Sequence, residues 1–131
     1  MKTSEYEEIR KNEGDRYEFK YKGFDCKIIR IEPSTNGHLC GYVAIPWESK
    51  LHGISIPEIE GKYDIHTHGG ITYAEFERDN QYWLGFDCAH AGDLIPTFKY
   101  FYNSGETYRD MEYVKKNLML MVDSIIEVGV R

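Results

Sequence analysis

Apolar and polar residues alternate over much of the chain, and this pattern predicts β-strands. Within the run at 24–31, Phe24, Cys26 and Ile28 fall on one face. Pro46 ends the third run, and residues 47–61 have a composition typical of a loop. The runs predicted as strands, or as one strand bent at a glycine pair, cover residues 17–21, 24–31, 39–45, 63–68, 71–76 and 81–87.

A different spacing predicts helices at the two ends of the chain. Near the N-terminus, Ser4 and Glu7 match a capping box, and Gly14 is placed to end a short helix. Near the C-terminus, a weak capping signal at Thr107 and a stop at Gly129 bracket a long amphipathic helix. Its apolar residues at helical spacing are Met111, Val114, Leu118, Met121, Val122 and Ile125.

These elements predict an α+β fold in which a mostly antiparallel sheet of about five or six strands is covered by the C-terminal helix. Strands and helices do not alternate, which argues against a Rossmann-like fold. The length of 131 residues fits a single domain over residues 1–131.

Composition narrows the classes of function. The net charge of −6 disfavours direct nucleic-acid binding, which needs a basic surface. No apolar run is long enough to span a membrane, and the first residues lack the apolar segment of a signal peptide. The three cysteines fit reduced thiols, so we expect a cytoplasmic protein.

Charge is distributed unevenly along the chain. Residues 33–93 contain nine acids and three bases, whereas residues 1–32 carry eight of each and residues 94–131 five of each. All five histidines and two of the three cysteines also lie in this middle segment. We therefore expect recognition or chemistry to reside there, on a scaffold formed by the two flanks.

Three pairs of potential ligands are spaced two residues apart, a spacing that on a strand points both side chains to one face. A subset could bind zinc with help from Asp87 or Asp93. Against this, the chain has no metal-binding motif of high specificity, and Cys40 suits a small core residue. The pairs are His38 with Cys40, His66 with His68, and Cys88 with His90.

A second hypothesis is nucleophilic or acid–base catalysis. Cys88 leaves a strand into a turn, where a thiol can be exposed near backbone N–H groups. His68 or His90 would act as the base, oriented by Asp87 or Asp93. The alternative is that Cys88 is a packed thiol at a strand end.

A third hypothesis is a ligand pocket without turnover. Glycines allow close backbone approach, and aromatic rings such as Trp47 could stack a planar group, although for Tyr42 and Trp83 the core is the favoured location. The glycine pair could instead form only a hairpin turn. The candidate ligand-binding residues are His38, Tyr42, Gly69, Gly70, Thr72, Tyr73, Asp87 and Gly92.

Three segments, GHLCGYVAIP, HGGITY and WLGFDCAHAGD, resemble an uncharacterised family of small proteins found in phages, prophages and mobile elements. The resemblance covers roughly residues 37–96. It favours His68 over His66, because an acid often stands at position 66 in the pattern. In the family pattern a His-Pro pair often follows the GYV motif. Here the corresponding loop is residues 48–53, which lacks that pair but contains His52. The motif residues are His38, Cys40, Gly41, Tyr42, His68, Gly69, Gly70, Thr72, Gly85, Asp87, Cys88, His90, Gly92 and Asp93.

The resemblance implies no established reaction, but it implies a setting in phage–host conflict. We weigh three functions. The first is binding of a small polar ligand, including a nucleotide-like one, in counter-defence. The second is a small hydrolase using His68, Cys88, His90 and Asp93, metal-assisted or through the thiol. The third is an acidic inhibitor of a nucleic-acid-binding host defence protein, acting through Glu58, Glu60, Glu75 and Glu77.

Overall fold

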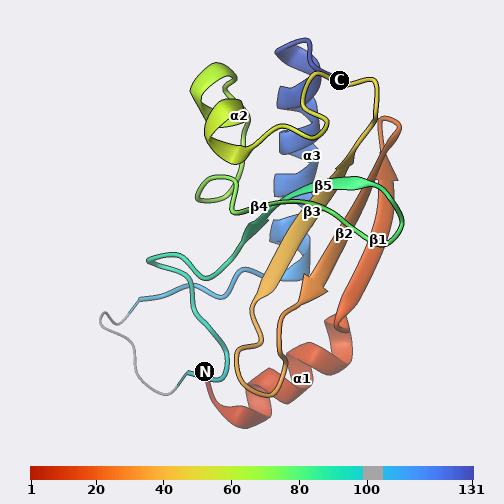
Figure 1. Cartoon of the computed structure of the whole chain (residues 1–131). Helices are drawn as coiled ribbons and strands as arrows, with labels where there is room; N and C mark the ends of the chain where they lie inside the picture. Colours follow the sequence, from red (N-terminus) through yellow and green to blue (C-terminus); the bar gives the residue numbers. More distant parts are fainter. Residues whose placement is uncertain (99–104) are drawn as a thin grey trace.

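The computed structural model describes residues 1–98 and 105–131. Within these residues the chain forms three helices and five strands (Figure 1). In chain order they are α1 (Thr3–Glu13), β1 (Arg16–Tyr21), β2 (Phe24–Arg30), β3 (Leu39–Ile45), α2 (Ile56–Lys62), β4 (Tyr73–Phe76), β5 (Tyr82–Asp87) and α3 (Met111–Glu127).

The strands form one antiparallel sheet in the order β1-β2-β3-β5-β4. Figure 1 shows α3 running behind the sheet and α1 lying at the end where β1 begins and β2 ends. The predicted α+β class, with a C-terminal helix packed on the sheet, is therefore confirmed. No helix in the described residues is long and apolar enough to cross a membrane.

The main core lies between α3 and one face of the sheet. Phe24, Cys26 and Ile28 point to this face, as their spacing predicts, and they are almost fully buried. The predicted apolar stripe of the helix packs against them: Val114, Leu118, Met121, Val122 and Ile125 are fully buried. Side-chain periodicity alone therefore located the core face of both layers.

The opposite face of the sheet, here called the open face, has no described helix packed on it (Figure 1). It carries a second, smaller cluster of buried side chains: Cys40, Tyr42, Ala44 and Trp83. Burial of Tyr42 and Trp83 agrees with the prediction that they are core residues, although they belong to this second cluster. One row of paired residues crosses this face, namely Glu18, Lys27, Tyr42, Gly85 and Tyr73.

Three local predictions were wrong. Residues 47–61 are not all loop, because α2 begins at Ile56 with Pro57 in its first turn, a position that tolerates proline. Residues 63–68 form no strand. Gly69 and Gly70 neither close a hairpin nor bend a strand; both have positive φ angles of 76° and 96° within a loop that leads to β4.

Helix ends differ from the sequence signals in their caps. The predicted Ser4–Glu7 capping box is absent, since Lys2 is the N-cap of α1 and makes no side-chain cap bond. Asp110, not Thr107, caps α3 by accepting a hydrogen bond from the backbone N–H of Tyr113 at 2.8 Å. Gly14 does follow the end of α1, as predicted.

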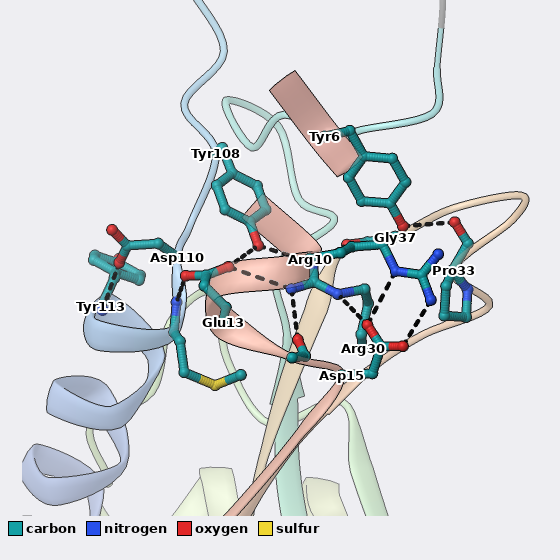
Figure 2. A network of polar contacts seen from close by, with 12 residues as sticks. Tyr6, Arg10, Glu13, Asp15, Arg30, Pro33, Gly37, Tyr108, Asp110 and Tyr113 are labelled. Atoms are coloured by element: carbon teal, nitrogen blue, oxygen red, sulfur yellow. Dashed lines mark hydrogen bonds and ion pairs between the residues drawn. The ribbon is translucent and has the colours of Figure 1, made fainter. Parts of the chain in front are cut away.

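A buried arginine ties α1 to the sheet (Figure 2). The Arg30 side chain is completely buried, and its nitrogens donate to the carboxylates of Glu13 and Asp15. They also donate to the carbonyls of Gly14 and Gly37 and to the Tyr108 hydroxyl; the Gly37 bond is 2.8 Å. Such full pairing is what makes a buried guanidinium tolerable. The network fixes the turn immediately before His38.

Candidate functional site

The open face of the sheet contains a pocket of about 480 Å³ at the end where β3 begins and β5 ends. We call it the open-face pocket. Its size falls within the range of small-molecule sites. The lining residues are Ile31, His38, Cys40, Tyr42, Thr72, Tyr73, Phe86, Asp87 and Ala89. The structure thus brings together five of the predicted ligand-binding residues: His38, Tyr42, Thr72, Tyr73 and Asp87.

His38 is the most unusual group in this pocket. His38 is only 7% exposed, and its Nδ1 atom is buried without a hydrogen-bond partner among the described residues. Burial lowers the pKa of His38, and the nearby Asp87 and Asp93 carboxylates only partly oppose this effect. The imidazole is therefore neutral at pH 7, with one buried nitrogen unsatisfied. Such groups are rare in folded proteins and call for an explanation.

Asp87 supplies the only formally charged side chain among the described lining residues. Its Oδ1 accepts a hydrogen bond from the backbone N–H of Ala89 at 3.0 Å. Tyr42 and Tyr73 remain neutral phenols, because burial raises both pKa values, in the case of Tyr73 to about 12. No lysine or arginine within residues 1–98 and 105–131 lines the pocket. Its electrostatic character is consequently negative.

Two aromatic rings form walls at nearly a right angle. The ring centroids of Tyr42 and Tyr73 lie 5.1 Å apart with an interplanar angle of 82°. The Tyr42 ring lies over Gly85, where an added Cβ would come within 2.5 Å of the Tyr42 Cδ1. Tyr73 is fixed through its hydroxyl, which donates to Glu77 at 2.7 Å. Glycine at position 85 is therefore needed for this arrangement.

A second group of polar residues, here called the His68 cluster, comprises His68, Asp93, Arg109 and Tyr113. Nε2 of His68 lies 2.8 Å from Oδ2 of Asp93, and its Nδ1 lies 2.6 Å from the Tyr113 hydroxyl. A carboxylate can only accept, so Nε2 of His68 donates. In the neutral imidazole Nδ1 then accepts from Tyr113. Both ring nitrogens are thus used within the cluster.

Asp93 is the centre of the His68 cluster and is only 4% exposed. It accepts hydrogen bonds from His68, from Nε of Arg109 at 2.9 Å and from the backbone N–H of His90 at 3.0 Å. Burial alone would raise the pKa of Asp93, but these hydrogen bonds outweigh burial and lower it. Asp93 is therefore an ionised, structurally fixed carboxylate.

His90 connects the two groups. Its Nε2 lies 3.4 Å from Oδ1 of Asp87 in the open-face pocket, close enough for an ion pair when the ring is protonated, but it makes no hydrogen bond. Its ring centroid is 5.8 Å from that of His68. Gly69 has a φ of 76°, and a Cβ there would lie 2.5 Å from the His90 ring. Gly69 thus allows the ring to pack against the loop.

Cys88 does not suit the proposed role of nucleophile. It is 2% exposed and belongs to the main core cluster, on the side of the sheet covered by α3. Burial is the main cause of its raised pKa, and the neighbouring Asp93 and Asp87 carboxylates raise it further. The thiol is protonated at neutral pH, whereas attack requires the thiolate. The alternative of a packed thiol at a strand end describes its environment.

The three histidine and cysteine pairs do not converge on one point. His66 contacts Asn117 of α3, with 3.1 Å between Nε2 and Oδ1, while His68 turns to Asp93. Across the described residues, no group of three or more His, Cys, Asp or Glu side chains is arranged to hold a metal ion. The strand expected at 63–68, which would have pointed His66 and His68 to the same face, is absent.

The remaining predicted residues lie outside the open-face pocket. Gly70 faces the Glu60 carboxylate, and Gly92 accepts a backbone hydrogen bond from Thr107 at 2.8 Å. Trp47 is 76% exposed and does not line the pocket. Trp83 belongs to a neighbouring hollow of about 340 Å³ on the same face.

That neighbouring hollow is a weaker candidate because its charged groups are paired. Lys27 forms an ion pair with Glu77 and lies 4.0 Å from the centre of the Trp83 ring. Asp79 accepts from Trp83 at 3.2 Å, and Arg16 pairs with Glu18. Every one of these charges has a partner, whereas the Nδ1 atom of the neutral His38 has none among the described residues.

Two members of the His68 cluster were missed by the sequence reasoning. Arg109 and Tyr113 lie in the charge-balanced C-terminal flank, where no motif marked them. They reach Asp93 and His68 because the backbone at Thr107 pairs with Gly92 and Leu94, both at 2.8 Å. The one available signal for Tyr113 was its hydroxyl group. Tyr113 lies in the first turn of the predicted helix, next to apolar residues that face the core.

Comparisons with models of protein families, with curated proteins and with solved structures found no match.

Proposed function

We propose that the protein binds a small polar ligand in the open-face pocket. Two observations carry this proposal. His38 lines a pocket together with aromatic rings and a carboxylate, and its Nδ1 is buried without a hydrogen-bond partner among the described residues. A ligand that hydrogen-bonds to this imidazole would remove the cost of leaving a buried polar atom unsatisfied.

The His68 cluster supports binding by fixing the walls of the pocket. It joins the loop before Thr72, the turn after Asp87 and the start of α3 through one carboxylate. A rigid wall reduces the entropy lost on binding. Because both His68 nitrogens are engaged and Cys88 is buried, these residues serve binding better than hydrolysis.

An inhibitor acting through an acidic face is less well supported. Glu77 is occupied by Lys27 and Tyr73, and Glu60 accepts a hydrogen bond from the backbone of Ile71 at 3.3 Å. Glu58 accepts a hydrogen bond from the Ser55 hydroxyl at 3.0 Å. Three of the four carboxylates needed for that role thus have intramolecular partners. The setting in phage–host conflict stays a prediction from the motif resemblance.

Thermal unfolding in the presence of nucleobases, nucleosides, nucleoside monophosphates and free amino acids tests the proposal. A ligand at a concentration of 100 times its Kd stabilises the folded state by about 2.7 kcal/mol, which raises the melting temperature by several degrees. We expect at least one compound class to stabilise the wild-type protein. No stabilisation by any compound would contradict the proposal.

Variants locate the site. His38→Gln and Thr72→Val should each reduce the stabilisation, and Thr72 is exposed, so its variant should fold normally. His52→Gln is the matched control, because His52 packs against Phe76 and Tyr82 outside the pocket. Stabilisation that survives both pocket variants would place the ligand elsewhere and reject the open-face pocket.

A further inference from the structure

The lining of the open-face pocket also defines the chemical class of its ligand, an inference that rests on the proposed function. We infer that the ligand presents a planar, uncharged or cationic heterocycle with adjacent N–H donors, and that a phosphate or carboxylate group does not enter the pocket. The inference follows from the charge, the shape and the unused acceptors of the lining.

Charge excludes an anion. Among the residues that the structure describes, Asp87 is the only formally charged side chain lining the pocket, and no lysine or arginine of that set balances it. The imidazole of His38 is neutral and so offers no positive charge. Phosphate recognition would need cations or converging backbone N–H groups. An anionic ligand would instead be repelled by Asp87.

Shape favours a flat ring. Tyr42 and Tyr73 stand at an interplanar angle of 82°, so a planar group can lie against the face of one ring and meet the edge of the other. Both offset-stacked and edge-to-face contacts between aromatic rings are favourable. The apolar part of the lining includes Ile31, which suits the same ring, whereas the Phe86 side chain is buried in the main core.

Unused acceptors favour a donor-rich edge. Among the described residues, Oδ1 of Asp87 accepts from Ala89, while Oδ2 has no hydrogen-bond partner. A carboxylate has about four acceptor positions. A heterocycle with an amino group beside a ring N–H can donate two parallel hydrogen bonds to it, an arrangement that is strong when the ring is cationic.

Three probes that share one ring test this class: 2-aminobenzimidazole, 2-methylbenzimidazole and benzimidazole-2-carboxylate. Their affinities are measured by ligand-observed NMR titration of the full chain. We expect the amino compound to bind at least tenfold more tightly than the methyl compound, a difference of about 1.4 kcal/mol. We expect no binding of the carboxylate.

Asp87→Asn provides the decisive variant, because it keeps the shape of the side chain and removes the charge. It should bring the amino and methyl compounds to similar affinity. Glu75→Gln is the matched control, since Glu75 lies on the same face of the sheet but does not line the pocket. This control should leave the preference for the amino compound unchanged.

The outcomes separate this inference from the proposed function. Equal binding of the three probes, tighter binding of the carboxylate, or a preference that survives Asp87→Asn would overturn the ligand class. Absence of binding by all three probes would also overturn it. In each case the wider compound panel still decides whether the open-face pocket binds a ligand at all.

Discussion

Oδ2 of Asp93 lies 2.8 Å from Nε2 of His68, and this contact joins the turn after β5 to the loop before β4, 25 residues apart in sequence. Asp93 is buried and accepts two further hydrogen bonds from Arg109 and the His90 backbone. The contact therefore holds together the backbone on either side of the open-face pocket.

Replacing Asp93 should destabilise the protein strongly. Asp93→Asn removes the anion that faces Arg109 and His68, and loss of one partner from a buried ion pair costs about 3–5 kcal/mol. Urea unfolding measures this loss. The matched control is Asp123→Asn, because Asp123 forms an exposed ion pair with Lys22 that is worth less than about 1 kcal/mol. Equal losses in the two variants would show that the His68 cluster is not structurally important.

Asp93 should also contribute to acid sensitivity. Its pKa is lowered in the folded protein, so below the ordinary value of 3.8 the unfolded chain takes up a proton that the folded protein does not. The contribution is fully present above that value and is lost as the pH falls through the lowered pKa. The free energy of unfolding should therefore fall less steeply with acid in Asp93→Asn, as measured by urea unfolding at several pH values.

His38 should make stability depend on pH in a higher range. Its pKa is lowered from 6.5 by burial, so below that value the unfolded chain gains a proton that the folded protein excludes. The free energy of unfolding should thus decrease as the pH falls through this range. His38→Gln should reduce the slope, whereas His52→Gln, which retains His38, should keep the contribution. Identical slopes for all three proteins would argue against a buried neutral His38.

All three cysteines should be unreactive in the native protein. Each is buried, and burial raises the pKa of Cys26 and Cys40 to about 12 and that of Cys88 further. A chromogenic disulfide reagent should react rapidly only after denaturation. Cys88→Ala should retain ligand binding. A fast-reacting native thiol at position 88 would revive the hypothesis of a nucleophile.

Gly85→Ala should disturb the open-face pocket by pushing against the Tyr42 ring. The added Cβ would approach the Tyr42 ring to 2.5 Å and the Gly41 carbonyl oxygen to 2.7 Å. Such overpacking costs about 1–3 kcal/mol and should displace Tyr42, weakening ligand binding. Gly61→Ala is the matched control, since nothing lies within 4 Å of its added Cβ and alanine favours the helix. Urea unfolding and probe titration check both variants.

Strand pattern and helix periodicity predicted most of the fold because both layers have a clear buried face. The spacing of Phe24, Cys26 and Ile28 determined the core side of β2, and the stripe from Val114 to Ile125 determined that of α3. Residues 63–68 were mispredicted because their apolar residues alternate as in a strand. In the structure, long-range contacts such as that from His66 to Asn117 hold them instead.

The candidate site was predicted in part. The concentration of histidines and acids at 33–93 directed attention to His38, His68, Asp87 and Asp93, which the structure places in the open-face pocket and the His68 cluster. Sequence spacing could not assign each residue to the open-face pocket or to the His68 cluster. That assignment depends on which side of the sheet each residue faces after the chain leaves β5. Nor could it identify Arg30, whose burial depends on acceptors from separate segments.

The most direct test of a ligand site at His38 is a long-range ¹H–¹⁵N NMR spectrum of the histidine side chains. It is recorded on the full chain with and without the compound that stabilises it most. The account predicts that the His38 Nδ1 resonance shifts as the atom gains a hydrogen-bond partner, while the His52 and His66 resonances remain unchanged. An unchanged His38 resonance in the saturated complex would contradict the proposed site.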